Sequence, residues 1–363
     1  MKVQKIVPKH DFWRSIPKPF FVLAPMANVT DFAFRSMIAK YGKPDVIWTE
    51  FVSADGLDSV GKNRLLVDLK FSEKERPIVA QLFTGHPEAM KKAAKLCAEL
   101  GFDGLDINMG CPDRAVEKQG GGATAMKDPG NALEVLRAAR QGWEEKTKKK
   151  APFELSKGGK TDNTRNIIPV SIKTRIGYNK VDMEWLKTLL EVHQPNLPAL
   201  TVHLRTRKEM SDVPAHWELM PKIIKLRDEV QADINPTERT LIIGNGDVES
   251  VVDAVAKVRE SGCDGVMIGR GIFGTPWLFQ NARLWRDADP KTPEERLTIM
   301  VEHAKLFEKT FCGAKRLKNF AVMKKHFKVY VSGWDGAKEL RVKLMETKNA
   351  SQVDKIVKEY LKK

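Results

Sequence analysis

The residue best suited to acid–base chemistry is Cys111, which stands between Gly110 and Pro112 and shortly before the glycine run 120–122. Glycines on both sides of a thiol allow the chain to bend tightly around it. A thiol has a reference pKa of about 8.5, so at neutral pH it keeps its proton and can act as a general acid. The alternative for any cysteine is a small buried hydrophobic residue. We predict that Cys111 is catalytic, because it follows a strand on the rim where a barrel enzyme reacts.

The other three cysteines are Cys97 in a helical pattern, Cys263 just before a strand, and Cys312 in the C-terminal region. None forms a CxxC pair, so neither a zinc site nor a disulfide framework is indicated. The seven histidines show no HExxH spacing, and we expect no metal site. Free thiols suit a reducing compartment, so we expect a cytoplasmic location.

Positive charges and glycine-rich turns predict an anion-binding site. Lys173 ends an apolar run, and Arg175 shares its face of the strand. A buried lysine is costly without a partner, and an anionic reduced flavin would be a suitable one; an ion pair with Asp106 is the alternative. Two later runs end in the turns 245–247 and 269–271. Glycine there lets main-chain N–H groups face a phosphate, although any tight turn also favours glycine.

Three further polar residues end apolar runs. The amide of Gln81 both donates and accepts, so it could bind the edge of a flavin ring or be a satisfied core glutamine. Asn108 stands just before the Cys111 loop. His203 precedes Arg205 and Arg207, and it could hold a cofactor, orient a substrate base or lie in the core.

These residues need a scaffold that brings the ends of many strands together. Apolar runs bounded by Gly, Pro, Asn or Asp alternate with helical patterns, as expected of buried parallel strands. The alternation predicts an α/β fold, a (β/α)8 TIM barrel, with a doubly wound sheet as the alternative. The expected strands are Phe20–Ala24, Val46–Glu50, Ile78–Leu82, Gly104–Asn108, Ile168–Lys173, Ala199–His203, Leu241–Gly244 and Gly265–Gly269.

The strand pattern ends near residue 285, so we predict a barrel domain over 1–285 and a C-terminal helical domain over 286–363. Thr292 begins a capping box with Pro293 at the first helical position. The lysine-rich segment 144–165 fits neither pattern. We interpret it as a solvated insertion on the face away from the reactive rim, and a nucleic-acid arm is the alternative.

The charge balance favours a polyanionic partner. The 363 residues include 62 Lys and Arg against 47 Asp and Glu, a net charge of +15. Such an excess is typical of nucleic-acid or anionic-membrane binding, although it also serves solubility. No apolar run approaches the ~18 residues of a membrane span, so we expect no membrane partner.

The motifs together resemble the tRNA-dihydrouridine synthases over about residues 20–345. The blocks that carry the resemblance are LAPM at 23–26, QLF at 81–83, INMGCP at 107–112, GGGA at 120–123, VSIKTR at 170–175, NGD at 245–247, MIGRG at 267–271 and MKKH at 323–326. The INMGCP block with its glycine cluster is the specific one, whereas LAPM and IGRG occur in several flavin barrels.

The resemblance implies an FMN-dependent oxidoreductase, with NADPH or NADH as reductant, that reduces the C5–C6 double bond of tRNA uridines to 5,6-dihydrouridine. Hydride passes from flavin N5 to C6, and Cys111 protonates C5. The uridine leaves its stack to reach the flavin. The implied FMN-binding residues are Pro25, Met26, Ala27, Gln81, Lys173, His203, Asn245, Gly246, Asp247, Gly269 and Arg270. Asn108 and Arg175 are expected to contact the substrate.

A basic helix near the C-terminus is expected to hold the tRNA backbone through Lys324, Lys325 and His326. The alternative is an ordinary amphipathic surface helix. Its basic side chains are Lys315, Arg316, Lys318, Lys324, Lys325, His326 and Lys328.

One loop departs from the family. Its members read HGRT followed by a tyrosine, whereas this chain has HLRT at 203–206 and Ser211 near the tyrosine position. Two other functions remain open: a flavin barrel acting on a small molecule, and a tRNA-binding protein without catalysis. Neither the modified uridine nor the preference between NADPH and NADH is readable, and we expect a monomer.

Overall fold

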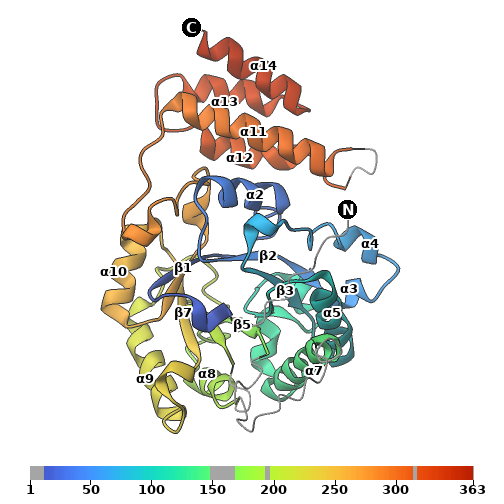
Figure 1. Cartoon of the computed structure of the whole chain (residues 1–363), viewed down its shortest axis with the longest axis vertical. Helices are drawn as coiled ribbons and strands as arrows, with labels where there is room; N and C mark the ends of the chain where they lie inside the picture. The colour runs from blue at the N-terminus through green and yellow to red at the C-terminus, as the bar shows by residue number, and fades with distance from the viewer. Residues whose placement is uncertain (1–11, 148–167, 193–196, 314–316, 363) are drawn as a thin grey trace, which may run out of the picture.

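The computed structural model describes residues 12–147, 168–192, 197–313 and 317–362 (Figure 1). Eight parallel strands close into a barrel in the order β1 to β8. The (β/α)8 prediction is therefore confirmed. The strands are β1 Phe20–Leu23, β2 Val46–Ser53, β3 Ile78–Phe83, β4 Gly104–Met109, β5 Val170–Arg175, β6 Ala199–His203, β7 Leu241–Asn245 and β8 Gly265–Ile268.

Strand ends differ from the expectation by up to three residues. β2 continues to Ser53 through a register irregularity between Trp48 and Phe51. β5 starts at Val170 rather than Ile168. Pro169 has no N–H to donate to a neighbouring strand, which explains the later start.

Helices cover the outside of the barrel (Figure 1). They are α1 Phe12–Ser15, α2 Phe32–Tyr41, α3 Ala54–Leu57, α4 Lys62–Leu65, α5 Pro87–Leu100, α6 Arg114–Glu117, α7 Pro129–Thr147, α8 Met183–Leu190, α9 Met220–Val230 and α10 Val251–Ser261. Their ends carry the expected signals. Asp128 accepts from Asn131 N at 3.0 Å at the start of α7, and Gly101 ends α5 in the left-handed region at φ 87°.

The interior of the barrel changes from apolar to polar along the strands. At the N-terminal end Trp13, Phe20, Trp48 and Met267 form one apolar cluster. Alternate residues of a strand face opposite sides. Because Leu105 and Ile107 of β4 pack in the outer core between strands and helices, the residues between and after them face inward. The inward positions near the C-terminal ends are therefore available for chemistry.

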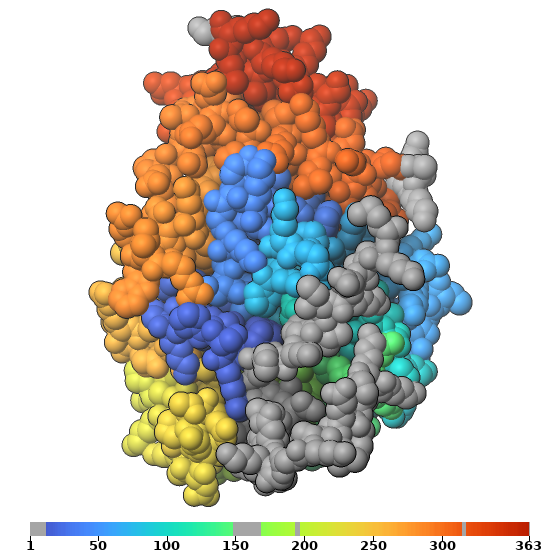
Figure 2. Space-filling view, in the orientation of Figure 1, coloured from blue at the N-terminus to red at the C-terminus, as the bar shows by residue number. Residues whose placement is uncertain are grey.

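The C-terminal helices are α11 Pro293–Phe311, α12 Met323–Tyr330, α13 Ala337–Met345 and α14 Ala350–Leu361. They form one end of the molecule, orange to red in Figures 1 and 2. The predicted capping box of Thr292 and Glu295 begins α11. Their apolar core also takes in Ala33 and Met37 of α2 and Trp277, which follows β8. The predicted helical region is confirmed, and its separation from the barrel at residue 285 stays a prediction.

The basic helix is shorter than its sequence pattern suggests. α12 begins at Met323, after a 3-10 turn over Phe320–Val322 in which Asn319 accepts from Ala321 N at 2.8 Å. Lys318 therefore precedes the helix. Lys315, Arg316 and most of the lysine-rich segment 144–165 lie outside the described residues.

Candidate active site

The predicted site residues meet at one rim because the strands are in register. Asn108 pairs with Lys173, and Arg175 pairs with His203, which in turn pairs with Asn245. These five residues come from β4, β5, β6 and β7. Side chains spread over more than a hundred positions of the chain thus line one end of the barrel.

The Cys111 loop is held by main-chain hydrogen bonds. Asn108 Oδ1 accepts from Gly110 N at 3.2 Å and from Cys111 N at 2.9 Å. On the other side, Ala123 N donates to the Cys111 carbonyl at 2.8 Å. The thiol is partly exposed, and burial raises its pKa above the ordinary value. Cys111 therefore holds a proton at neutral pH in a loop with a defined position, as a general acid requires.

Arg175 also stabilises the Cys111 loop. Its guanidinium donates to the carbonyls of Gly110, Thr206 and Met210, each at 2.9 Å. It is only 5% exposed, and burial lowers its pKa to about 10. Arg175 joins the Cys111 loop to the loop after β6. The hydrogen bonds of Arg175 and Asn108 described here all go to other residues of the protein. Their contact with substrate therefore stays a prediction.

Lys173 is a half-buried cation whose hydrogen-bond partner is neutral. Its Nζ donates to Asn245 Oδ1 at 3.0 Å, and Asn245 Nδ2 donates onward to the Met267 carbonyl at 2.9 Å. Burial, and then the charge of Arg175, lower the pKa of Lys173 to about 8. Within the described part of the chain, the hydrogen bond of the Lys173 ammonium group goes to Asn245 and not to a carboxylate, although the charge of Asp106 raises the pKa of Lys173 somewhat.

Gln81 lies deeper than a residue at the rim. It is fully buried, donates through Nε2 to Asp106 Oδ2 at 2.7 Å, and accepts from Asn108 Nδ2 at 3.1 Å. These are the contacts of a satisfied core glutamine. Its predicted contact with a flavin ring stays untested.

The turns after β7 and β8 form a cationic corner. Asp247 has a positive φ of 48°, and its carboxylate accepts from Arg270 Nη2 at 2.7 Å and from Arg205 Nη2. Arg205 Nη1 also lies 3.3 Å from His203 Nε2. Burial and the surrounding cations hold the pKa of His203 well below its ordinary value, so its ring is neutral. Asp247 thus positions two arginines beside the turn at Gly269, and the exposed one, Arg270, is available to a phosphate.

The loop after β1 completes the rim. Pro25 and Met26 are half-buried and Ala27 is exposed. The Met26 carbonyl accepts from Val29 N at 3.1 Å and from Thr30 N at 3.0 Å, which fixes the loop. Its exposed side is free for the predicted ligand.

The prediction that His326 contacts RNA is wrong. Its ring is fully buried and packs against Phe34 and His303, with ring centroids 4.9 and 4.7 Å away. Burial holds its pKa well below the ordinary value. The sequence pattern of α12 placed it among lysines, but it lies on the face turned toward the barrel. Its neighbours Lys324 and Lys325 are half-buried, with surface available.

Two sets of polar residues at the rim were not predicted. Glu117 accepts from Arg207 Nη2 at 2.6 Å and from Tyr178 at 3.1 Å, which joins three loops beside Cys111. Lys318 pairs with Glu50 at 2.7 Å and with Asp68 at 2.8 Å, so the C-terminal region is joined to the barrel rim. Their partners are far apart in sequence, and no local motif marks them.

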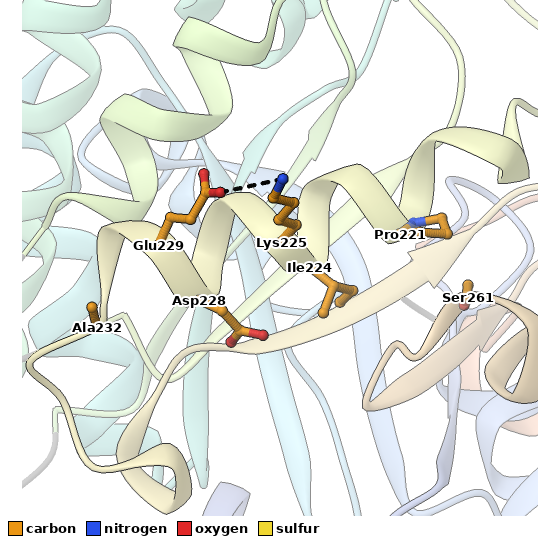
Figure 3. A pocket seen from close by; sticks show the side chains of 7 residues that line it. All are labelled: Pro221, Ile224, Lys225, Asp228, Glu229, Ala232 and Ser261. Carbon is orange, nitrogen blue, oxygen red and sulfur yellow. Dashed lines mark ion pairs between the residues drawn. The ribbon is translucent and has the colours of Figure 1, made fainter.

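The hollow drawn in Figure 3 is not this site. It lies on the outer wall and is lined by α9, the following Ala232, and Ser261 of α10, with Lys225 and Glu229 paired at 3.6 Å. None of its residues ends a strand of the barrel.

No helix of the described residues is long and apolar enough to cross a membrane.

A family model described as dihydrouridine synthase matches residues 22–363, which includes the barrel, the Cys111 loop and the C-terminal helices. The chain belongs to the dihydrouridine synthase family. The resemblance of the motifs is thus confirmed, and with it the assignment to the oxidoreductases.

Curated relatives agree with this membership. The chain is 37% identical over 354 residues to the probable tRNA-dihydrouridine synthase 2 of Bacillus subtilis (strain 168), with 97% of each chain covered. It is 36% identical to the probable tRNA-dihydrouridine synthase of Staphylococcus aureus (strain COL), covering 97% of this chain and 96% of the relative. A solved morphinone reductase in complex with tetrahydroNAD is 13% identical at a TM-score of 0.46, covering 77% of this chain and 91% of that one.

Proposed function

We propose that this chain reduces uridine to 5,6-dihydrouridine in tRNA, with FMN at the C-terminal rim of the barrel and NADPH or NADH as the reductant. The observation that carries the proposal is a loop-held thiol beside a half-buried lysine whose hydrogen-bond partner is neutral. Lys173 stands opposite Asn108 in the strand register, and the Asn108 side chain accepts from Cys111 N, which supports one shared site.

The donor set suits FMN. Lys173 offers a positive charge to a flavin that becomes anionic on reduction, with Asn245 fixing its ammonium group. Arg270 and the N–H groups of the turns at Gly246 and Gly269 would hold the phosphate, with His203 and Asp247 at the same corner. Pro25, Met26 and Ala27 would pack beside the ring, and Gln81 would support it from below. When bound, FMN supplies the hydride that reduces the C5–C6 double bond.

The protein supplies the proton and the position. Cys111 gives its proton to C5 of the base, because a thiol whose pKa is raised by burial stays protonated until the transition state. Asn108 and Arg175 hold the loop that carries the thiol. The base has to leave its stack to enter the rim, which costs a few kcal/mol. Residues 286–363 would bind tRNA phosphates through Lys324 and Lys325 and so help to meet that cost.

The first experiment is the visible absorbance spectrum of the purified protein, followed by a search for dihydrouridine in unmodified tRNA incubated with the protein and NADPH or NADH. Flavin bands and dihydrouridine are expected. Free uridine in place of tRNA should oxidise the reduced protein far more slowly. Equal rates with free uridine would favour a small-molecule reductase, and a colourless protein that takes up no FMN would contradict the proposal.

The proton donor is tested separately with C111A. Removing a general acid lowers the rate by roughly 10²–10⁴-fold. We expect that loss in single-turnover formation of dihydrouridine, with reduction of the flavin by NADPH unchanged. C312S is the matched control, because Cys312 lies in the C-terminal helical region and has no part in the site.

We also propose that the protein is a monomer, and light scattering of the pure protein checks this.

A further inference from the structure

A continuous chain of buried hydrogen bonds leads from Asp106 to the Cys111 loop. Gln81 Nε2 donates to Asp106 Oδ2 at 2.7 Å, and Asn108 Nδ2 donates to Gln81 Oε1 at 3.1 Å. Asn108 Oδ1 then accepts from Cys111 N at 2.9 Å. The three side chains come from β3 and β4, and the strand register puts Gln81 directly opposite Asp106. The chain links a carboxylate inside the barrel to the backbone of the proposed proton donor.

The direction of this chain is set at its inner end. An ionised carboxylate has no proton to donate, so it accepts only the NH2 end of Gln81. The oxygen of Gln81 then faces Asn108 and accepts only its NH2 end. The oxygen of Asn108 is left to face the main-chain N–H groups of Gly110 and Cys111. Reversing either amide would oppose two donors or two acceptors somewhere along the chain.

Burial prevents the two amides from turning to other hydrogen-bond partners. Asp106 and Gln81 are fully buried and Asn108 is 7% exposed, so water does not offer replacement partners to the first two. The other oxygen of Asp106 accepts from Ser171 Oγ at 2.6 Å. A buried polar group left without its partner costs about 1–3 kcal/mol. The carboxylate of Asp106 therefore determines which way both amides point.

We propose that Asp106 is a positioning residue for the reaction: its carboxylate orients Gln81 and Asn108 so that the loop carrying the Cys111 thiol is held in place. This inference rests on the proposed role of Cys111 for its effect on catalysis. Its effect on the loop does not depend on that role.

The charged state of Asp106 gives the proposal a pH signature. Burial raises its pKa to about 6, and the hydrogen bonds from Ser171 and Gln81 and the charge of Lys173 oppose that rise. Below about pH 6 the protonated group becomes a donor, and the order of the chain is no longer unique. The rate of dihydrouridine formation should therefore fall on the acid side of about pH 6.

The test compares D106N with S171A. The D106N side chain keeps the shape of the aspartate but carries an NH2 end of its own, so it no longer imposes one direction on Gln81. We expect D106N to form dihydrouridine roughly tenfold or more slowly at pH 7.5 in single turnover, since a small misplacement of a reacting group can cost up to about 10²-fold. Its acid limb should be absent. S171A keeps the carboxylate but removes a bond that lowers its pKa, so its acid limb should move to higher pH while its rate at pH 8 stays near wild type.

The second readout is the rate at which iodoacetamide alkylates Cys111 at pH 8 in the cofactor-free protein, measured by mass spectrometry of its peptide. A loosened loop should expose the thiol, so alkylation in D106N should be several-fold faster, with S171A unchanged. The amide oxygen in D106N can still accept a hydrogen bond from Gln81, whereas the D106L side chain has no acceptor. We therefore expect alkylation of Cys111 to be at least as fast in D106L as in D106N.

Wild-type alkylation together with a wild-type pH profile in D106N and D106L would overturn the inference and leave the proposed function intact. Full activity of C111A would instead overturn the role of Cys111 as acid. The alkylation result would still decide whether Asp106 positions the loop.

Discussion

The ammonium group of Lys173 has a neutral hydrogen-bond partner at the rim. Asn245 accepts from it at 3.0 Å, and burial lowers its pKa to about 8. An anionic ligand would add negative charge beside the ammonium group and favour the charged lysine. A cationic lysine attracts such a ligand only below its own pKa.

The affinity for FMN should therefore weaken as the pH rises through about 8, because Lys173 loses its charge there. K173M should bind FMN more weakly at pH 7 and lose this dependence. Fluorescence titration of the cofactor-free protein measures both. A K173M variant with the pH dependence of the wild type would assign the effect to another group.

The positions of single residues at the rim were predictable where the residue type suggests chemistry, whereas their roles stay predictions. A cysteine in a glycine-flanked loop and a lysine ending an apolar strand stand out in the sequence, and both lie at the rim. The partners of Gln81 and Arg175 were not predictable, because they come from other strands and loops. The prediction for His326 failed because α12 has two different faces. The lysines of α12 reach solvent, whereas His326 lies on the opposite face and packs against Phe34.

At the scale of elements, the first residue of the 3-10 helix η2 (Gly122–Lys127) supports the Cys111 loop. Gly122 has a φ of 60°, and a Cβ added there would lie 2.5 Å from the Cys111 carbonyl oxygen. This position needs glycine for its backbone conformation and for the close approach of two chain segments.

G122A should displace the Cys111 loop and slow dihydrouridine formation by roughly 10²-fold, as expected for a reacting group moved by about 1 Å. The control is G313A, because a Cβ there meets nothing within 4 Å. Single-turnover kinetics with both variants decide the matter, and a G122A enzyme as fast as G313A would show that the loop tolerates the change.

α11 and α12 bring two histidines together in the core of the C-terminal region. His303 is fully buried beside His326 and Phe34, and burial lowers its pKa to about 3. In the unfolded chain a histidine takes up a proton near pH 6.5, so between about pH 6.5 and 3 the unfolded state binds more protons than the folded one. Stability must then fall as the pH falls.

We expect the free energy of unfolding to drop by about 1.4 kcal/mol per pH unit for each such histidine below pH 6. H303F should flatten the slope of a denaturation series between pH 6.5 and 4.5. An equal slope in the wild type and in H303F would mean that carboxylates govern the acid limit.

The elements were predictable to within a few residues because strand and helix patterns alternate along the chain. What the pattern could not predict is where the helical region attaches. That attachment depends on Ala33 and Met37 of α2, which in sequence are ordinary residues of the first barrel helix.

At the scale of the whole molecule, the net charge of +15 needs a defined surface to be useful. Lys324 and Lys325 belong to α12, one of the C-terminal helices that form one end of the molecule (Figure 1). Lys325 is half-buried, and burial lowers its pKa. Neutral replacements therefore make a better test than reversed charges, because burying a new charge is costly.

K324Q/K325Q should weaken tRNA binding and reduce the slope of log K against log salt by about 2, because two phosphates of the RNA would no longer be neutralised. K222Q/K225Q is the matched control, since both lysines are exposed on α9, on the outer wall of the barrel. The proposal for α12 fails if the two double variants have the same salt slope.

The apolar core that α2 shares with the C-terminal helices also limits how the protein can be recombined with its relatives. A chimera joined at residue 285 would pair Ala33 and Met37 with foreign helices, leaving a mismatched core. It would also separate Lys318 from the carboxylates of Glu50 and Asp68. A chimera that exchanges the C-terminal helices should therefore keep its packing and these ion pairs only if α2, Glu50 and Asp68 are exchanged with them.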